Sequence, residues 1–111
     1  MLVHWGFFAT LIFLFAGHAL CDYSWQNDFI AIHKSHKALA SPFPWWQILF
    51  AHSIIHAGMV LFITGSTTCA VLELLIHFVT DWSKCDGRIS FSADQSIHYL
   101  CKLAWAIVMT L

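Results

Sequence analysis

The chain alternates between long apolar segments and shorter polar stretches. The apolar segments are residues 3–22, 45–64, 68–82 and 93–111. An amphipathic extension and loop at 23–44 and a polar loop at 83–92 lie between them. Apolar segments of about 20 residues are typical of helices that cross a bilayer. The pattern therefore predicts an all-α, multi-pass transmembrane four-helix bundle that forms a single membrane domain over residues 1–111.

The N-terminal half needs two further interpretations. The first apolar segment has neither the positively charged start nor the small-residue cleavage site of a secretory signal peptide. We interpret it as a membrane helix, with a cleaved signal as the alternative. The region after it places Trp25, Phe29 and Ile32 at helical spacing. We expect the first helix to continue into this region until Pro42 and Pro44 break it.

The composition supports a membrane protein. Of the 111 residues, 59% are hydrophobic and 10% are charged, whereas about 25% of the residues of an ordinary soluble domain are charged. The alternative is an unusually apolar soluble helical bundle. A net charge of −1 and the lack of a basic stripe argue against nucleic-acid binding. Four well-separated cysteines form no CxxC pair and suggest neither a zinc knuckle nor a redox motif.

Positive charges indicate the orientation of the predicted helices. In a protein with four spans the two polar loops lie on the same side of the membrane. These loops hold four cations, Lys34, Lys37, Lys84 and Arg88. The opposite side, with both termini and the turn at 64–67, holds no lysine or arginine. The positive-inside rule then predicts an inner-membrane protein with both polar loops in the cytoplasm and both termini in the periplasm.

Each apolar segment carries a pair of polar residues spaced four apart. The pairs are His18 with Asp22, His52 with His56, His77 with Asp81, and Asp94 with His98. Residues four apart share one face of a helix. All four pairs also fall toward the polar-loop side of their segments. This agreement in depth predicts one composite polar site between the four helices.

A site of histidines and aspartates between helices suits a divalent metal ion such as Zn, Mn or Fe. Charged side chains within a membrane cost about 3 kcal/mol each near the centre of a span, so they are kept when they are paired, hydrated or bound to a metal. We predict that seven residues are ligands of one or two ions: His18, Asp22, His52, His56, His77, Asp81 and His98.

The remaining polar residues of the site have predicted roles in chemistry. Asp94 is predicted to be a further ligand or a general base beside a metal-bound water. Lys84 is predicted to stabilise negative charge. Together with Gln26 or Gln95 it would bind an anionic group such as a phosphate.

Each pair taken alone has a plainer interpretation. A histidine on an apolar helix usually packs or makes a hydrogen bond between helices, and Asp22 and Asp94 also suit helix ends. Glu73 is expected to face solvent, because it lies nearer the far side of its segment. Three further histidines have no predicted role: His4, His33 and His36.

The residues of the composite site also carry a resemblance to a known family. The series is His18, Asp22 and Gln26, then Lys34, His52 and His56, then His77, Asp81 and Lys84, and finally Asp94, Gln95 and His98. It resembles a family of small bacterial and phage membrane proteins, catalogued as a domain of unknown function (number 3307), over nearly the whole chain. The resemblance implies a multi-pass helical membrane protein without an established activity. The His/Asp pairs are also loosely similar to those of inner-membrane metal-dependent hydrolases.

The sequence leaves three functional hypotheses. The first is a metal-dependent hydrolase that acts on a lipid-linked or phosphate-bearing substrate at the cytoplasmic membrane face. The second is a proton or metal-ion conduit, which needs polar groups through the full depth of the bilayer. The third is a non-catalytic phage membrane protein that modifies the host envelope, for example to exclude a second infection. The expected partner is the lipid bilayer, and a membrane-protein partner or a homo-oligomer stays open.

Overall fold

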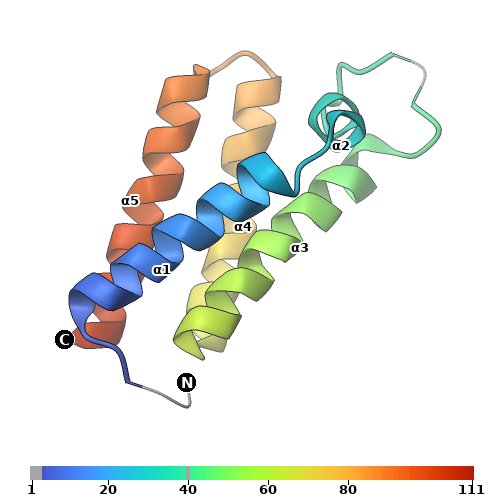
Figure 1. Ribbon diagram of the computed structural model, residues 1–111. Coiled ribbons are helices and arrows are strands. Elements are labelled where there is room, and N and C mark those ends of the chain that lie inside the picture. The colour runs from blue at the N-terminus through green and yellow to red at the C-terminus, as the bar shows by residue number, and fades with distance from the viewer. Residues whose placement is uncertain (1–3, 40) are drawn as a thin grey trace.

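The computed structural model describes residues 4–39 and 41–111. In these ranges the chain is helical and contains no strand, which confirms the predicted all-α class. Five α-helices and one π-helical turn follow each other along the described chain. They are α1 (Phe7–Ala19), the π-helical turn Leu20–Ser24, α2 (Asp28–His33), α3 (Trp45–Thr64), α4 (Thr67–Cys85) and α5 (Phe91–Thr110) (Figure 1).

Local sequence signals set where the helices begin and end. The side chains of Asn27, Ser66 and Ser90 accept hydrogen bonds from backbone amides in the first turns of α2, α4 and α5. Gly65 ends α3 with a φ of 69°, and Gly87 follows α4 with a φ of 81°. Glycine adopts this left-handed conformation without steric cost. Because no helix breaker occurs before Gly87, α4 is longer than the apolar segment that predicted it.

The end of the first helix differs from the expectation. Instead of continuing toward the prolines, α1 passes into the π-helical turn, where the amide of Trp25 donates to the carbonyl of Leu20 at 2.8 Å. Asn27 then caps α2 as a separate helix of six residues. The wider winding of the π-helical turn ends the regular α-helix, and the Asn27 cap starts a new one. The helix of the predicted segment 3–22 begins at Phe7, and residue 3 lies outside the described residues.

The four long helices pack in a closed ring. Helix α1 contacts α3 and α5, and α4 contacts the same two helices. In Figure 1, α2 and the α4–α5 turn lie at one end of the molecule, which we call the loop end. The start of α1, the α3–α4 turn and the C-terminus lie at the opposite end, which we call the terminal end (Figure 1).

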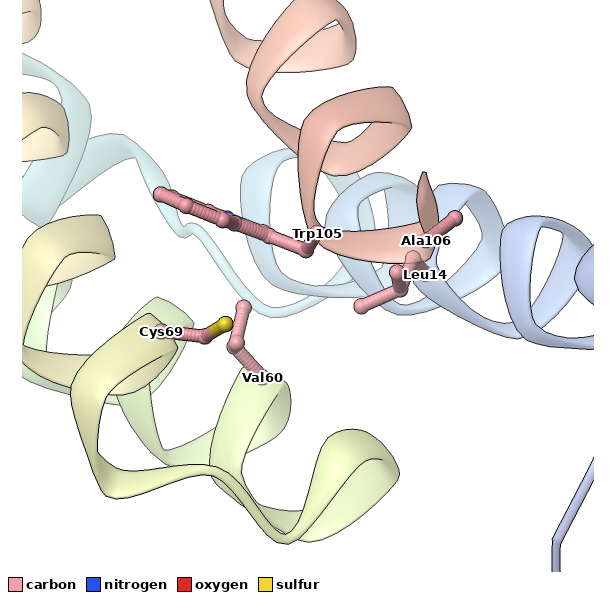
Figure 2. Packing of buried hydrophobic residues seen from close by; sticks show 5 residues of the cluster. All are labelled: Leu14, Val60, Cys69, Trp105 and Ala106. Atoms are coloured by element: carbon pink, nitrogen blue, oxygen red, sulfur yellow. The ribbon is translucent and has the colours of Figure 1, made fainter. Parts of the chain in front are cut away.

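An apolar cluster fills the ring toward the terminal end. Its buried side chains come from all four long helices and are Leu14, Val60, Cys69, Trp105 and Ala106 (Figure 2). Partly buried hydrophobic residues of the same helices pack against it. The interior nearer the loop end is polar instead, because it holds the histidines and aspartates of the four predicted pairs.

The exterior of the described chain is apolar on every long helix. Phe8 of α1, Phe62 of α3, Val79 of α4 and Leu100 of α5 are 76%, 84%, 61% and 63% exposed. The buried residues, by contrast, include more polar and charged side chains than apolar ones. This is the reverse of the usual distribution in a soluble domain. Extended apolar surface of this kind indicates contact with a membrane or with another protein.

Two helical segments of the described chain are long and apolar enough to cross a membrane, Phe7–Ser24 and Trp45–Thr64. Core helices of soluble proteins and signal sequences near an N-terminus share this length and composition. Helices α4 and α5 have 19 and 20 residues, but the charged side chains on their inner faces make them less apolar overall.

Gly17 gives a test of the close approach of α1 and α3. A Cβ at Gly17 would lie 2.7 Å from Cγ of Met59 and 3.2 Å from Cδ1 of Ile63, whereas a Cβ at Gly58 would meet nothing within 4 Å. We expect Gly17→Ala to unfold more easily than the control Gly58→Ala, by about 1–3 kcal/mol, because α3 must shift or Met59 must repack. Thermal unfolding in one detergent measures the difference. Equal unfolding temperatures would contradict the close approach.

Candidate metal centre

Three polar residues line one face of α4, as their spacing predicts. Glu73, His77 and Asp81 are each 1% exposed, so this face points into the ring. The expectation that Glu73 faces solvent is wrong, because its carboxylate accepts hydrogen bonds from Nζ of Lys102 and, at 2.9 Å, from Nε1 of Trp105. The buried carboxylate therefore has a cationic partner on α5, which local spacing along α4 does not reveal.

The five histidines of the predicted pairs form one cluster inside the ring. The imidazole of His77 stacks on those of His56 and His98, with centroid distances of 3.8 and 4.1 Å. His52 lies beside His77 at 5.1 Å, and His18 lies beside His98 at 5.3 Å. All five side chains are at most 2% exposed. The four helices thus bring the predicted histidines together, which the agreement in depth had indicated.

Asp22 lies where three helices converge. Its Oδ1 is 3.0 Å from Nε2 of His52 and 3.3 Å from Nε2 of His56, both on α3. Its Oδ2 accepts a hydrogen bond of 2.6 Å from Nε2 of Gln95 on α5. Asp22 belongs to the π-helical turn that follows α1. Such helix irregularities occur frequently at functional sites, and this one falls at the residue on which the other donors converge.

Two overlapping groups of donor atoms are close enough to hold a metal ion, since the atoms of each group lie within 4.8 Å of one another. Three imidazole nitrogens with one carboxylate oxygen suit a tetrahedral zinc site, and the same donors accept Mn or Fe. The four-donor group is Asp22, His52, His56 and His77. The three-donor group is Asp22, Asp94 and His98.

Two residues predicted to be ligands, His18 and Asp81, belong to neither group. Nε2 of His18 lies 3.0 Å from Oε1 of Gln95. Oδ2 of Asp81 accepts a hydrogen bond of 2.7 Å from Nζ of Lys34, and Oδ1 lies 3.0 Å from Nζ of Lys84. In this structure His18 therefore holds Gln95 in place, and Asp81 holds two lysines.

His77 fits a metal ligand better than a packing residue. Neither of its ring nitrogens has a hydrogen-bond partner, although both are buried. Nδ1 lies 3.7 Å from Oε1 of Glu73 and Nε2 lies 3.9 Å from Oδ2 of Asp81, and both distances are too long for hydrogen bonds. A buried polar group without a partner costs about 1–3 kcal/mol. Nε2 of His56 and Nδ1 of His18 are likewise buried without a hydrogen bond.

Lys34 is a site residue to which sequence reasoning gave no role. It directly follows α2, is 2% exposed, and donates to Oε1 of Gln26 at 2.6 Å as well as to Asp81. A lysine in a polar loop looks like an ordinary positive-inside residue, as Lys37 does. The only sequence signal for Lys34 was its place in the series that resembles a known family.

The residues predicted to bind an anion are engaged within the protein. Lys84 contacts Asp81, Gln26 accepts from Lys34, and Gln95 is buried among the residues of the centre. The amide of Gln95 donates to the carboxylates of Asp22 and Asp94. The two lysines, Lys34 and Lys84, lie at the border of the site nearest the loop end.

Besides the contact of Lys34 with Asp81, the segment after α2 contacts the α4–α5 turn through Asp86. Nε of Arg88 donates to Oδ2 of Asp86 at 2.7 Å, and Nε2 of His36 lies 2.8 Å from Oδ1. The Arg88 guanidinium, and then the His36 ring, hold the pKa of Asp86 below its usual value. His36 had no predicted role, but it forms part of this contact at the loop end.

The comparisons with known proteins agree with the resemblance described above. A family model described as "Protein of unknown function (DUF3307)" matches residues 10–111. The chain belongs to this family. The matched range contains every residue of the two donor groups. No curated protein and no solved structure shows a significant match to the chain. The comparisons therefore place the chain in a family without assigning an activity to the cluster.

The buried pair of Glu73 and Lys102 gives a stability prediction. Lys102→Met leaves the Glu73 carboxylate buried without its cation, so we expect a loss of about 3–5 kcal/mol in the free energy of unfolding. The double variant Glu73→Gln/Lys102→Met removes both charges and should recover much of that loss. Unfolding of both variants and of Glu73→Gln in mixed micelles measures the coupling. Additive losses would contradict the pairing.

Proposed function

We propose that the chain is an integral inner-membrane protein of bacterial or phage origin, in which all four long helices cross the bilayer. The supporting observation is the distribution of side chains, because apolar residues cover the outer faces of these helices while charged residues point inward. Buried charges in a membrane face the interior of a bundle and pair with one another, as Glu73 and Lys102 do here. The cations at the loop end support its cytoplasmic location.

The polar cluster of this membrane protein binds a divalent metal ion, with Zn, Mn and Fe as the candidates. His77 carries this part of the proposal, because its two ring nitrogens are buried without partners beside three further donors. A divalent cation would satisfy one of these nitrogens and would offset the carboxylate of Asp22. The ligands in this proposal are the residues of the four-donor group, with Asp94 and His98 next to them.

The metal centre serves a hydrolase that acts on a phosphate ester at the cytoplasmic membrane face. A bound divalent ion would supply a water of lowered pKa and a positive charge that polarises the phosphoryl group. Attack of a water oxygen on phosphorus would form the new bond as the bond from phosphorus to the leaving oxygen breaks. Asp94 or a cluster imidazole would take the proton of the water and pass it to the leaving oxygen.

Two lysines at the border of the centre would bind the phosphate. Lys34 and Lys84 both contact the carboxylate of Asp81, so an incoming phosphate would compete with this carboxylate for the two ammonium groups. Lys34 is buried at the end of α2, so substrate entry also requires the segment of α2 to move away from the ring. A lipid-linked phosphate fits this position, because the exposed side chains of Tyr23, Trp25 and Phe29 lie along the stretch from the π-helical turn to α2 and suit the membrane interface.

The conduit hypothesis has less support. A conduit needs polar groups from one end of the ring to the other, but toward the terminal end the interior holds an apolar cluster, and the buried Glu73 beside it is paired with Lys102. In the non-catalytic hypothesis, the His/Asp cluster only holds the helices together or engages a membrane-protein partner. This hypothesis differs from the proposal in the metal content that it predicts, so a metal analysis of the purified protein decides between them.

We expect the protein, purified in mild detergent without chelator, to contain at least one equivalent of transition metal per chain by elemental mass spectrometry. The double variant His56→Ala/His77→Ala removes two of the four donors and should lose most of this metal. His33→Ala is the matched control, because His33 lies outside both groups and should leave the metal content unchanged.

The same preparations test the hydrolase. Addition of the bound metal should give hydrolysis of p-nitrophenyl phosphate or of phosphatidic acid in mixed micelles. Lys84→Met should lower the rate at least tenfold while it keeps the metal. Full metal loading without turnover of any phosphate ester would reject the hydrolase and keep the metal centre. A folded protein without metal would support the non-catalytic hypothesis.

Reporter fusions test the orientation. We expect alkaline phosphatase fused after Leu111 to be active and green fluorescent protein at the same position to be dark, because the terminal end faces the periplasm in this proposal. Fusions after Arg88 in the loop should give the opposite result. Cytoplasmic signals at both positions would reject a topology with four spans.

A further inference from the structure

The buried carboxylates of the described chain differ in their cationic partners. Glu73 is paired with Lys102, and Asp81 with Lys34 and Lys84. Two other buried carboxylates, Asp22 and Asp94, form ion pairs only with histidines among the described residues. An unpaired carboxylate in a low-dielectric interior is costly. The centre therefore has two carboxylates that, among the described residues, have no lysine or arginine within ion-pair distance.

The two oxygens of Asp22 face different donors. Oδ1 lies against His52 and His56 of the four-donor group. Oδ2 instead accepts from the amide of Gln95, and the same amide nitrogen donates to Oδ2 of Asp94 at 3.2 Å. Gln95 thus holds the carboxylates of Asp22 and Asp94 next to each other. Asp22 belongs to both donor groups, so its carboxylate is close enough to contact a cation in each of them.

Asp94 and His98 complete the second position. Oδ1 of Asp94 lies 3.2 Å from Nε2 of His98, four residues further along α5. Both side chains are 1% exposed, and their donor atoms lie within 4.8 Å of a carboxylate oxygen of Asp22. A carboxylate and an imidazole on one helix, turned inward toward a shared carboxylate, resemble the donor arrangement of two-metal sites in helical bundles.

We propose that the centre holds two divalent metal ions that share Asp22 as a bridging ligand. The first ion is bound by His52, His56 and His77, and the second by Asp94 and His98. This inference rests on the metal site proposed above and deepens it, because it makes Asp94 a ligand rather than a general base. Gln95 is a positioning residue that aligns the two carboxylates.

Charge balance then indicates the class of ligand that completes the centre. Two divalent ions carry more positive charge than the carboxylates of Asp22 and Asp94 neutralise. The two positive charges that remain would be neutralised by the dianion of a phosphate monoester, or by a hydroxide together with the monoanion of a phosphodiester. Two metal ions that contact the attacking and the leaving oxygens are a recurrent arrangement for phosphate-ester hydrolysis. A second ion would thus favour the binding of phosphate esters over the binding of neutral substrates.

The test is the metal stoichiometry of the full chain in detergent after loading with Mn²⁺ alone. We expect about two equivalents in the unmodified protein, and an electron paramagnetic resonance spectrum of two coupled Mn²⁺ ions. Asp94→Asn and His98→Gln should each reduce the content to about one and replace the coupled signal by that of an isolated ion. Ser96→Ala, an exposed position on the same helix, is the matched control and should keep both ions.

Each result bears on the two proposals differently. One equivalent in the unmodified protein, without coupling, overturns the second ion and leaves the single metal site standing. Two equivalents that Asp94→Asn and His98→Gln do not reduce overturn the assignment of these ligands. An unmodified protein that binds no Mn²⁺, Zn²⁺ or Fe²⁺ overturns the metal centre itself. If both variants fail to fold by circular dichroism and gel filtration, the coupled or isolated Mn²⁺ signal of the unmodified protein decides alone.

Discussion

Matching of buried charge is the constraint on which the interior of this molecule depends. The outer faces of the long helices are apolar, so every charged group between them needs a partner inside the ring. Lys102 meets this need for Glu73, and Lys34 with Lys84 meets it for Asp81. These pairs join α4 to α5 and to the segment after α2. Asp22 and Asp94 differ from these carboxylates, because histidines and a glutamine contact them instead of lysines. The metal proposal follows from that difference.

Much of the site was predictable from the sequence, because a spacing of four residues puts side chains on one helix face. That rule, with the agreement in depth, predicted that His18, His52, His56, His77 and His98 meet, and the apolar pattern predicted the four long helices. Contacts between elements far apart in sequence follow no such rule. The partner of Glu73 lies 29 residues away and that of Lys34 lies 47 residues away, so neither pairing could be foreseen.

The break after α1 was missed for a related reason. A π-helical turn has no strong sequence signature, since it widens one turn of an otherwise regular helix. Asp22 lies in this turn, and the turn starts the segment that leads through α2 to Lys34. The irregular part of the chain thus supplies both the carboxylate shared by the two donor groups and the lysine at their border.

The apolar cluster lies between the polar interior and the terminal end of the ring. Leu14, Val60 and Trp105 lie on the terminal side of the histidines, so solutes would reach the proposed metal centre from the loop end. A metal ion, a water molecule and a product would then all pass through the same compartment. Occupancy of the centre would follow the free metal concentration of that compartment alone. If the four long helices cross a bilayer as proposed, a change in metal supply on its opposite side would leave the protein unaffected.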